Sequence, residues 1–342
     1  QPAQDLPVVY RRLFSDIAMD TGDLITGRKA ELDRGRRVLD GELGGRLRSV
    51  ALVGPAGVGK RALVSALVRK VHTRDIHRIV LDAPVTTEEV QSWFETKSRD
   101  RLIAIEGLQW LFATEPDGMN PLRAFAQGLI KDDGKNRWLL HAHSSVWQTA
   151  NRVAGLSDAF AEVIELQPLG PDALAQAILA RHSMSGYELR FDGDPGLSFQ
   201  LRTLFRPSAE ATNRPQEAWF AALHDSTGGL LNDALRLWMA AIVQVDEARG
   251  IVVVGDLPEG TMEAMRSLPD QDLLTLRQIA RQGTMRVDTH SWLFRTSLVA
   301  SQAHLGHLAH LGLLEPHGDC YALADHLRGS ISRVLRDRGW SE

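Results

Sequence analysis

A glycine-rich run follows a short apolar stretch at residue 50, and the spacing of its residues is typical of a loop that binds phosphate. The apolar stretch Val50–Val53 predicts a buried parallel strand. Glycines after such a strand let the backbone turn its N–H groups inward around an anion, and a following helix directs its positive end at the same point. Lys60 is placed to reach the outer phosphates. The residues expected to hold the phosphates of a nucleotide are Gly54, Pro55, Ala56, Gly57, Val58, Gly59, Lys60, Arg61 and Ala62.

The last position of this pattern departs from the usual one. The pattern normally closes with Ser or Thr, whose hydroxyl holds Mg²⁺, and this chain has Arg61 there. Three interpretations stay open. The guanidinium could contact phosphate oxygens in a bidentate manner and replace part of the charge of Mg²⁺. It could instead pair with Glu106 and close the site, or it could be a solvated residue beside an empty loop. Participation of Mg²⁺ is therefore uncertain.

Short apolar runs alternate with amphipathic segments through the first half of the chain. Runs at 77–81, 102–105, 138–142 and 163–166 predict further strands, and the segments between them predict helices. Alternation of this kind is typical of an α/β fold with a parallel sheet covered on both faces. We expect this domain to span residues 1–169.

Helical patterns dominate after residue 170. We expect a small helical lid over 170–249, with helices at 173–182 and 229–243 and a loop over 192–215. A small strand is expected near 250–257. From 257 to 342 the pattern gives three helices, two short strands around a turn at 317–319, and a last helix. This order predicts a winged-helix domain.

Taken in order, these motifs resemble those of the AAA+ class of P-loop ATPases, in particular the origin-recognition and STAND-type branch that carries a C-terminal winged helix. The segments that carry the resemblance are Gly27–Leu32, Gly54–Lys60, Leu102–Leu108, Glu165–Leu169 and Gly228–Leu235. The resemblance implies ATP or ADP as the ligand, with Gly27 and Arg28 bordering the base.

The same resemblance marks catalytic positions that have changed. In the family the third strand ends in Asp and then Glu; the first steadies the metal and its water, and the second orients the attacking water. Here Glu106 and Gly107 occupy these positions. Glu106 is a vestigial acid that could still serve the metal, one methylene further out, whereas Gly107 has no side chain with which to activate water.

Three further family positions are less securely aligned. The polar tip of the fourth strand falls near His141, His143 or Ser144. The arginine finger aligns with Ala159 beside Phe160, and the lid arginine aligns with Asn232. Because phosphoryl transfer depends on positioning and charge neutralisation, each loss should slow hydrolysis.

These observations predict a nucleotide-binding module with impaired or absent hydrolysis, a pseudo-ATPase that acts within a larger protein or complex. An active ATPase completed by residues of a partner is one alternative, and a winged-helix DNA-binding regulator is another. Residues 257–342 contain nine arginines, no lysine and ten acidic residues. A DNA module needs about six to ten phosphate contacts, so a protein partner or an oligomer is favoured over DNA.

Composition limits the classes of protein to which this chain could belong. The chain has 342 residues, a net charge of −4 and 44% hydrophobic residues, without an apolar run long enough to span a membrane. Cys320 is the single cysteine, which fits a reducing, cytoplasmic setting. Because the chain begins at Gln1 rather than Met, we interpret it as a piece of a longer protein.

His304, His307 and His310 recur every third residue, and this spread favours a polar helix face over a metal site.

Overall fold

The computed structural model describes residues 6–14, 27–42, 44, 47–73, 75–95, 99–112, 117–192, 214–257, 265–324 and 327–340. The chain forms two compact units. The first unit joins Gln1–Gly27 with Pro168–Ser267, and the second joins Arg28–Gln167 with Leu268–Glu342. The N-terminal segment therefore groups with the helical residues after 168. The three domains expected from the sequence stay a prediction.

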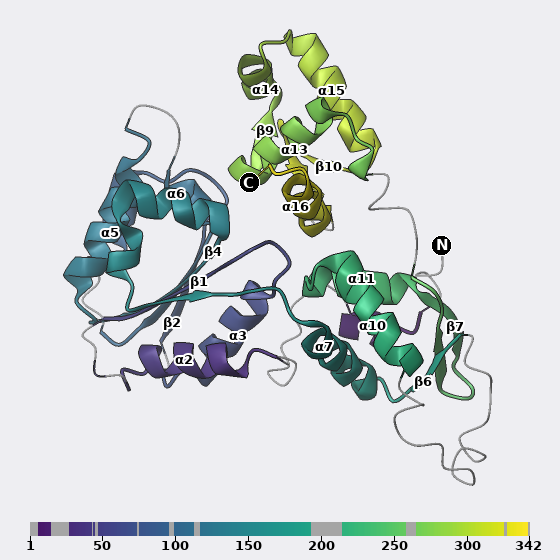
Figure 1. Ribbon diagram of the computed structural model, residues 1–342. Helices are drawn as coiled ribbons and strands as arrows, with labels where there is room; N and C mark the ends of the chain where they lie inside the picture. The colour runs from purple at the N-terminus through teal and green to yellow at the C-terminus, as the bar shows by residue number, and fades with distance from the viewer. Residues whose placement is uncertain are drawn as a thin grey trace. The chain divides into compact units, whose positions relative to one another are not determined.

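A five-stranded parallel sheet forms the centre of residues 28–167 (Figure 1), with the strand order β2-β3-β4-β1-β5. The strands are β1 (Arg48–Gly54), β2 (Ile76–Val80), β3 (Leu102–Glu106), β4 (Arg137–His143) and β5 (Glu162–Glu165). Every strand begins and ends within two residues of a predicted apolar run. The α/β fold class with a parallel sheet is confirmed.

Helices cover both faces of this sheet. Figure 1 shows α2 (Lys29–Leu39) and α3 (Lys60–Lys70) on one face, and α5 (Asn120–Asp132) and α6 (Ser144–Ala154) on the other. The short helix α4 (Thr87–Ser92) begins with a capping box formed by Thr86 and Glu89. Two 3₁₀ turns, Leu108–Leu111 and Leu156–Ala159, follow β3 and α6. Strands buried on both faces explain the continuous apolar runs of the sequence.

The first unit is built around aromatic side chains. Its helices are α1 (Val8–Phe14), α7 (Pro171–Met184), α10 (Arg214–Thr227) and α11 (Leu231–Ala240), with a three-stranded sheet in the order β6-β8-β7. Trp238 is fully buried, and its indole N–H donates to the hydroxyl of Tyr10 at 3.0 Å. This bond fastens α1 to the unit.

The strands of that small sheet were only partly expected. They are β6 (Glu188–Phe191), β7 (Ile242–Asp246) and β8 (Ile251–Val254). The strand near 250 is confirmed as β8, whereas β6 was not expected and the helix predicted to reach 243 ends earlier. Most of the predicted loop over 192–215 lies outside the described residues.

The C-terminal segment contains every element expected there and one more strand. Its helices are α13 (Asp270–Gln282), α14 (Val287–Phe294), α15 (Leu298–His310) and α16 (Arg328–Asp337). The strands β10 (Leu314–His317) and β11 (Cys320–Leu323) form the predicted hairpin, and β9 (Thr284–Arg286) pairs with β11 as an unexpected third strand. Its function as a winged helix stays a prediction. Among the described residues, no helix combines the length and apolar character needed to cross a bilayer.

Candidate functional site

The glycine-rich loop connects the end of β1 to the start of α3, as the sequence predicted. Gly57 and Gly59 have positive φ values of 75° and 97°, which turn the backbone through the loop. Gly54 is needed for a different reason. A Cβ atom there would lie 2.8 Å from the carbonyl oxygen of Leu166, because the segment after β5 passes directly beside the loop.

Lys60 lies at this loop. Its Nζ donates to the carbonyl oxygens of Gly54 at 2.8 Å and Pro55 at 2.6 Å. Lys60 is the first residue of α3, so its ammonium group is held where the loop begins, close to the backbone N–H groups at the start of that helix. A phosphate bound by those N–H groups would be within reach of the same ammonium group.

Arg28 connects three segments of the second unit. Its guanidinium pairs with Glu31 at 3.0 Å and donates to the carbonyl oxygens of Val58, at 3.4 Å, and Gln167. The side chain thus ties the beginning of α2 to the loop and to the segment after β5. Gly27 precedes it with φ of 79°. These contacts position the loop; the expectation that Gly27 and Arg28 border the base stays a prediction.

Glu106 is brought together with two groups from other elements. Its Oε2 lies 3.4 Å from Nε2 of His141 on β4 and 3.5 Å from Nε of Arg61 on α3. The contact with His141 contributes most to lowering the pKa of Glu106; burial opposes this effect, and Arg61 and Arg78 add to the lowering. The carboxylate is therefore charged at neutral pH. Of the three candidates for the polar tip of the fourth strand, His141 is the one that faces Glu106.

The donor set at this point does not fit a magnesium ion. In P-loop enzymes the ion is held by the hydroxyl of the loop and by an acid at the end of a neighbouring strand. Here residue 61, directly after Lys60, is an arginine, and its guanidinium Nε lies 3.5 Å from Oε2 of Glu106. A divalent cation at Glu106 would approach a fixed positive charge and would find one protein ligand. Among the described residues, no group of three potential ligands is gathered for a metal.

The position after Glu106 cannot carry a side chain in this backbone conformation. Gly107 has φ of 95°, and a Cβ atom there would lie 2.4 Å from the carbonyl oxygen of Leu81. The approach is fixed by a backbone hydrogen bond of 2.9 Å from the N–H of Leu81 to the carbonyl of Glu106. A water-activating carboxylate is thus excluded at this position by the path of the chain as well as by the residue type.

The remaining family positions have structural contacts. His143 caps α6, because its Nδ1 accepts from the backbone N–H of Ser145 at 3.3 Å. Ala159 and Phe160 are both buried in the core of the sheet. Asn232 lies in the first turn of α11, and Arg236 one turn later pairs with Asp233 at 2.6 Å.

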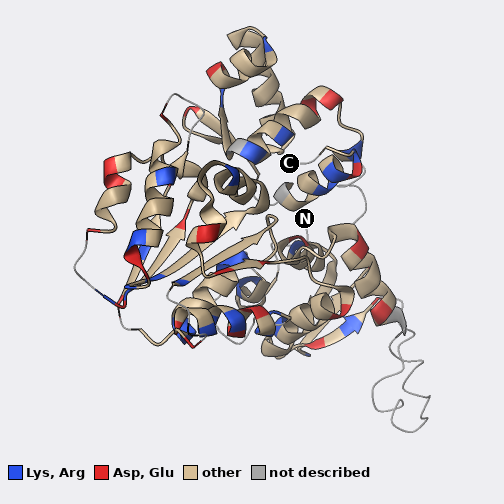
Figure 2. Ribbon diagram, turned by 60° about the vertical axis from the view of Figure 1, so that its left-hand side comes forward, with Lys and Arg blue, Asp and Glu red and all other residues tan. Residues whose placement is uncertain are grey.

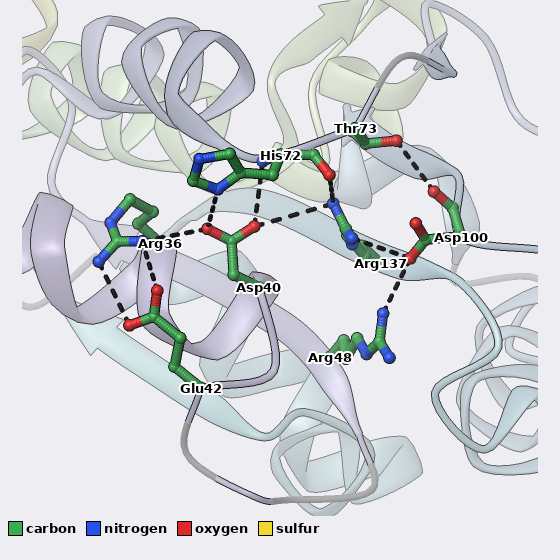
Figure 3. Close-up of polar contacts among 8 residues, drawn as sticks. All are labelled: Arg36, Asp40, Glu42, Arg48, His72, Thr73, Asp100 and Arg137. Atoms are coloured by element: carbon green, nitrogen blue, oxygen red, sulfur yellow. Dashed lines mark hydrogen bonds and ion pairs between the residues drawn. The ribbon is translucent and has the colours of Figure 1, made fainter.

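A second polar cluster, which the sequence did not predict, lies at the opposite end of the sheet (Figure 3). Arg137 at the start of β4 is 5% exposed; it donates to the carbonyl of His72 at 2.7 Å and pairs with Asp100 at 2.9 Å. Asp40 accepts from the backbone N–H of His72 and contacts its Nδ1, each at 3.0 Å. The residues drawn are Arg36, Asp40, Glu42, Arg48, His72, Thr73, Asp100 and Arg137.

The helix α15 contains no Asp, Glu, Lys or Arg, so it is drawn in tan in Figure 2. Trp292 on α14 and Val299 on α15 are 79% and 80% exposed. His304 turns inward, with Nε2 3.1 Å from the hydroxyl of Thr275, while His307 and His310 are exposed. The three histidines therefore do not converge. His307 and His310 lie on the exposed face that was predicted, whereas His304 faces the interior.

A buried histidine on α14, which the sequence analysis did not single out, contacts α15. His290 contacts the hydroxyl of Ser301 at 2.9 Å and that of Thr275 at 3.2 Å. Burial, with a smaller contribution from His304, lowers the pKa of His290 to about 4. The imidazole is therefore neutral and structural at physiological pH.

No protein-family model and no curated protein matches this chain. Solved structures do. The chain is similar to Orc1 of Aeropyrum pernix in complex with DNA, at 14% identity and a TM-score of 0.49, over 97% of each chain. It is similar to Orc2 of Aeropyrum pernix in its ADPNP–ADP complexes, at 14% identity and a TM-score of 0.47, over 97% of this chain and 99% of that one.

A third similar structure is the RuvB Holliday junction branch migration motor of Thermotoga maritima, at 15% identity and a TM-score of 0.45, over 92% of this chain and 94% of that one. These neighbours are AAA+ P-loop ATPases, the class that the sequence motifs resemble. The likeness concerns the fold.

Proposed function

We propose that this chain binds ATP or ADP at the loop Gly54–Ala62 and hydrolyses it slowly or not at all. The observation that carries the proposal is the loop itself, which places backbone N–H groups, Lys60 and the start of α3 at one point. On binding, Lys60 would exchange the carbonyl oxygens of Gly54 and Pro55 for phosphate oxygens.

Slow hydrolysis follows from what surrounds Glu106. Attack on the outer phosphate requires an oriented water and neutralisation of the developing charge. Gly107 has no room for a carboxylate, and Arg61 replaces the hydroxyl that would hold Mg²⁺. Loss of one preorganised group typically lowers a rate by about 10²- to 10³-fold, so two losses together leave little turnover.

The binding module would act as a nucleotide-responsive or scaffolding part of a larger protein or complex. The helix α15 contains no Asp, Glu, Lys or Arg and exposes Val299, and Trp292 is exposed on the neighbouring helix α14. These features support contact with a protein rather than with DNA. No cluster of cations marks this helix for phosphate backbones.

The test is titration of the whole chain with ATP and ADP by calorimetry, with phosphate release measured in parallel. Lys60→Ala should weaken binding by about tenfold or more, because a charge-assisted contact is lost. Lys70→Ala removes the same charge from the far end of α3 and is the matched control. Turnover of about 1 s⁻¹ or faster that Lys60→Ala abolishes would refute impaired hydrolysis and favour the active ATPase. Absence of nucleotide binding would refute the proposal as a whole.

A further inference from the structure

The position at which a P-loop protein would hold its metal is filled here by a guanidinium. Arg61 is the second residue of α3, and its side chain is 76% exposed. Its Nε lies 3.5 Å from Oε2 of Glu106, the same oxygen that lies 3.4 Å from Nε2 of His141. One carboxylate thus lies between an exposed cation and a histidine on a buried strand.

We propose that the loop takes the metal-free nucleotide in preference to its Mg²⁺ complex, with Arg61 as the residue that determines this specificity. The inference rests on the nucleotide binding proposed above and adds to it the charge state of the ligand. It departs from the usual site of this fold, in which the metal and the nucleotide enter together.

The pair between Arg61 and Glu106 can exchange for a phosphate at low cost. Ion pairs between exposed side chains are weak, and giving one up changes an equilibrium by at most about fivefold. A phosphate group offers the guanidinium two oxygens in a bidentate geometry, which is a stronger contact. Glu106 still has His141 beside it after Arg61 moves, so the exchange leaves no isolated carboxylate.

Electrostatics then discriminates between the two forms of the ligand. The metal-free nucleotide carries more negative charge than its Mg²⁺ complex, which suits Lys60, Arg61 and the positive end of α3. In the Mg²⁺ complex the metal would lie against Arg61 and would be repelled by it. We therefore expect Mg²⁺ to weaken binding, where it strengthens binding in a site with a loop hydroxyl.

The experiment compares ATP binding to the whole chain in EDTA and in excess Mg²⁺. The wild-type chain should bind metal-free ATP more tightly than Mg²⁺–ATP, by about tenfold. Arg61→Ser restores the usual hydroxyl; it should weaken binding in EDTA by about tenfold or more and make Mg²⁺ favourable. Arg61→Lys keeps the positive charge but loses the planar guanidinium, so its affinity for ATP in EDTA should lie between those of wild type and Arg61→Ser. Arg69→Ser removes one arginine from the last turn of α3 and is the matched control, expected to behave as wild type.

Glu106→Gln tests the exchange from the other side. The amide removes the charge that competes for Arg61 and should tighten binding in EDTA by up to about fivefold. Glu88→Gln, at an exposed position on α4, is the control and should leave the affinity in EDTA unchanged. A weaker affinity in Glu106→Gln would overturn the exchange, because Glu106 would then be a favourable ligand rather than a competitor.

The failure of this inference is distinguishable from that of the proposed function. Wild-type binding that is tighter with Mg²⁺ overturns the inference and leaves nucleotide binding intact. An Arg61→Ser chain that responds to Mg²⁺ as wild type does, while retaining its circular dichroism spectrum, overturns the role of Arg61. Absence of binding under both conditions overturns the proposed function and this inference together.

Discussion

Each end of the five-stranded sheet carries an arginine paired with a carboxylate, but the two arginines differ in how far they are exposed to solvent. At the amino ends of the strands, Arg137 is 5% exposed, pairs with Asp100 at 2.9 Å and donates to a backbone carbonyl. At the carboxyl ends, Arg61 is 76% exposed and lies 3.5 Å from Glu106. Arginine and carboxylate meet at both ends, but only the amino end buries its arginine.

The difference teaches which charges belong to the fold and which are available to a ligand. A buried charge must keep its partners, because desolvation is costly unless hydrogen bonds replace water. An exposed pair costs little to separate. In parallel α/β sheets, ligands bind outside the carboxyl ends of the strands, and this is the end that carries the exchangeable pair.

The largest effect is expected from Arg137→Met, which keeps most of the side-chain volume and removes the charge. Arg137 is buried, pairs with Asp40 at 3.8 Å and donates to the carbonyl of His72, and all of these contacts would be lost. We therefore expect the free energy of unfolding to fall by about 3 kcal/mol. Urea denaturation followed by circular dichroism measures this change.

Arg48→Met is the matched control for that variant, because Arg48 pairs with the same carboxylate, Asp100, at 2.8 Å but is far more exposed. Its cost should stay below about 1 kcal/mol. Equal losses in the two variants would show that burial does not set the value of these pairs, and the comparison between the two ends would fail.

A somewhat smaller loss is expected from Gly107→Ala at the carboxyl end. The new Cβ atom would meet the carbonyl of Leu81 at 2.4 Å, in addition to the strain of a positive φ. Gly155→Ala is the control, because Gly155 also has a positive φ but only an ordinary contact at 3.6 Å. We expect Gly107→Ala to lower the free energy of unfolding by about 2 kcal/mol more than the control does. Equal costs would mean that the chain can move away from this position, and Gly107→Glu would then become a usable probe of catalysis.

At the amino ends of the strands, the stability that Asp40 contributes should also depend on pH. Burial raises the pKa of Asp40, but hydrogen bonds from His72 and the charge of Arg137 outweigh burial, and the net pKa lies below the ordinary value of 3.8. The stability that this carboxylate contributes is thus present above pH 3.8 and is lost as the pH falls through the lower folded-state pKa.

We therefore expect the difference in unfolding free energy between wild type and Asp40→Asn to be present at neutral pH and to disappear in acid. Denaturation curves across that pH range check the prediction, with the exposed change Asp82→Asn as the control. A difference that grows as the pH falls would contradict the assigned direction of the pKa.

The smallest effect on stability is expected from Arg61→Ser. Its exposed pair with Glu106 should contribute less than about 0.5 kcal/mol, even though the same variant changes nucleotide binding. Thermal unfolding of the two chains without nucleotide measures this. A loss above about 1 kcal/mol would show that the pair at the carboxyl end is structural as well.

Local patterns in the sequence predicted most of the sheet. Apolar runs such as Leu102–Ile105 become strands because two covered faces exclude water from every side chain. The loop after β1 was also predictable, because its glycines and Lys60 are neighbours in the sequence. Short elements with weak apolar patterns, such as β6 and β9, were missed because their stability comes from pairing with distant strands rather than from their own residues.

Contacts between distant segments could not be predicted from sequence patterns. Arg137 and Asp40 are separated by many residues and meet only because α2 ends near the start of β4. Lone charged residues of this kind, on four different segments, have no spacing that marks them as a cluster. His304 likewise could be placed on a helix, but not against Thr275.

The sequence by itself determined which residue types stand at the loop and after β3: Lys60 and Arg61 at the loop, and Glu106 and Gly107 at the end of the strand. These are properties of residue type at fixed short spacing. Tertiary structure decided what those residues do to one another. Strand register put His141 beside Glu106, the start of α3 put Arg61 against the same oxygen, and the path of Leu81 closed the space at Gly107. The physical reason is that distance between charges, not their separation along the chain, sets their energy, and packing fixes that distance.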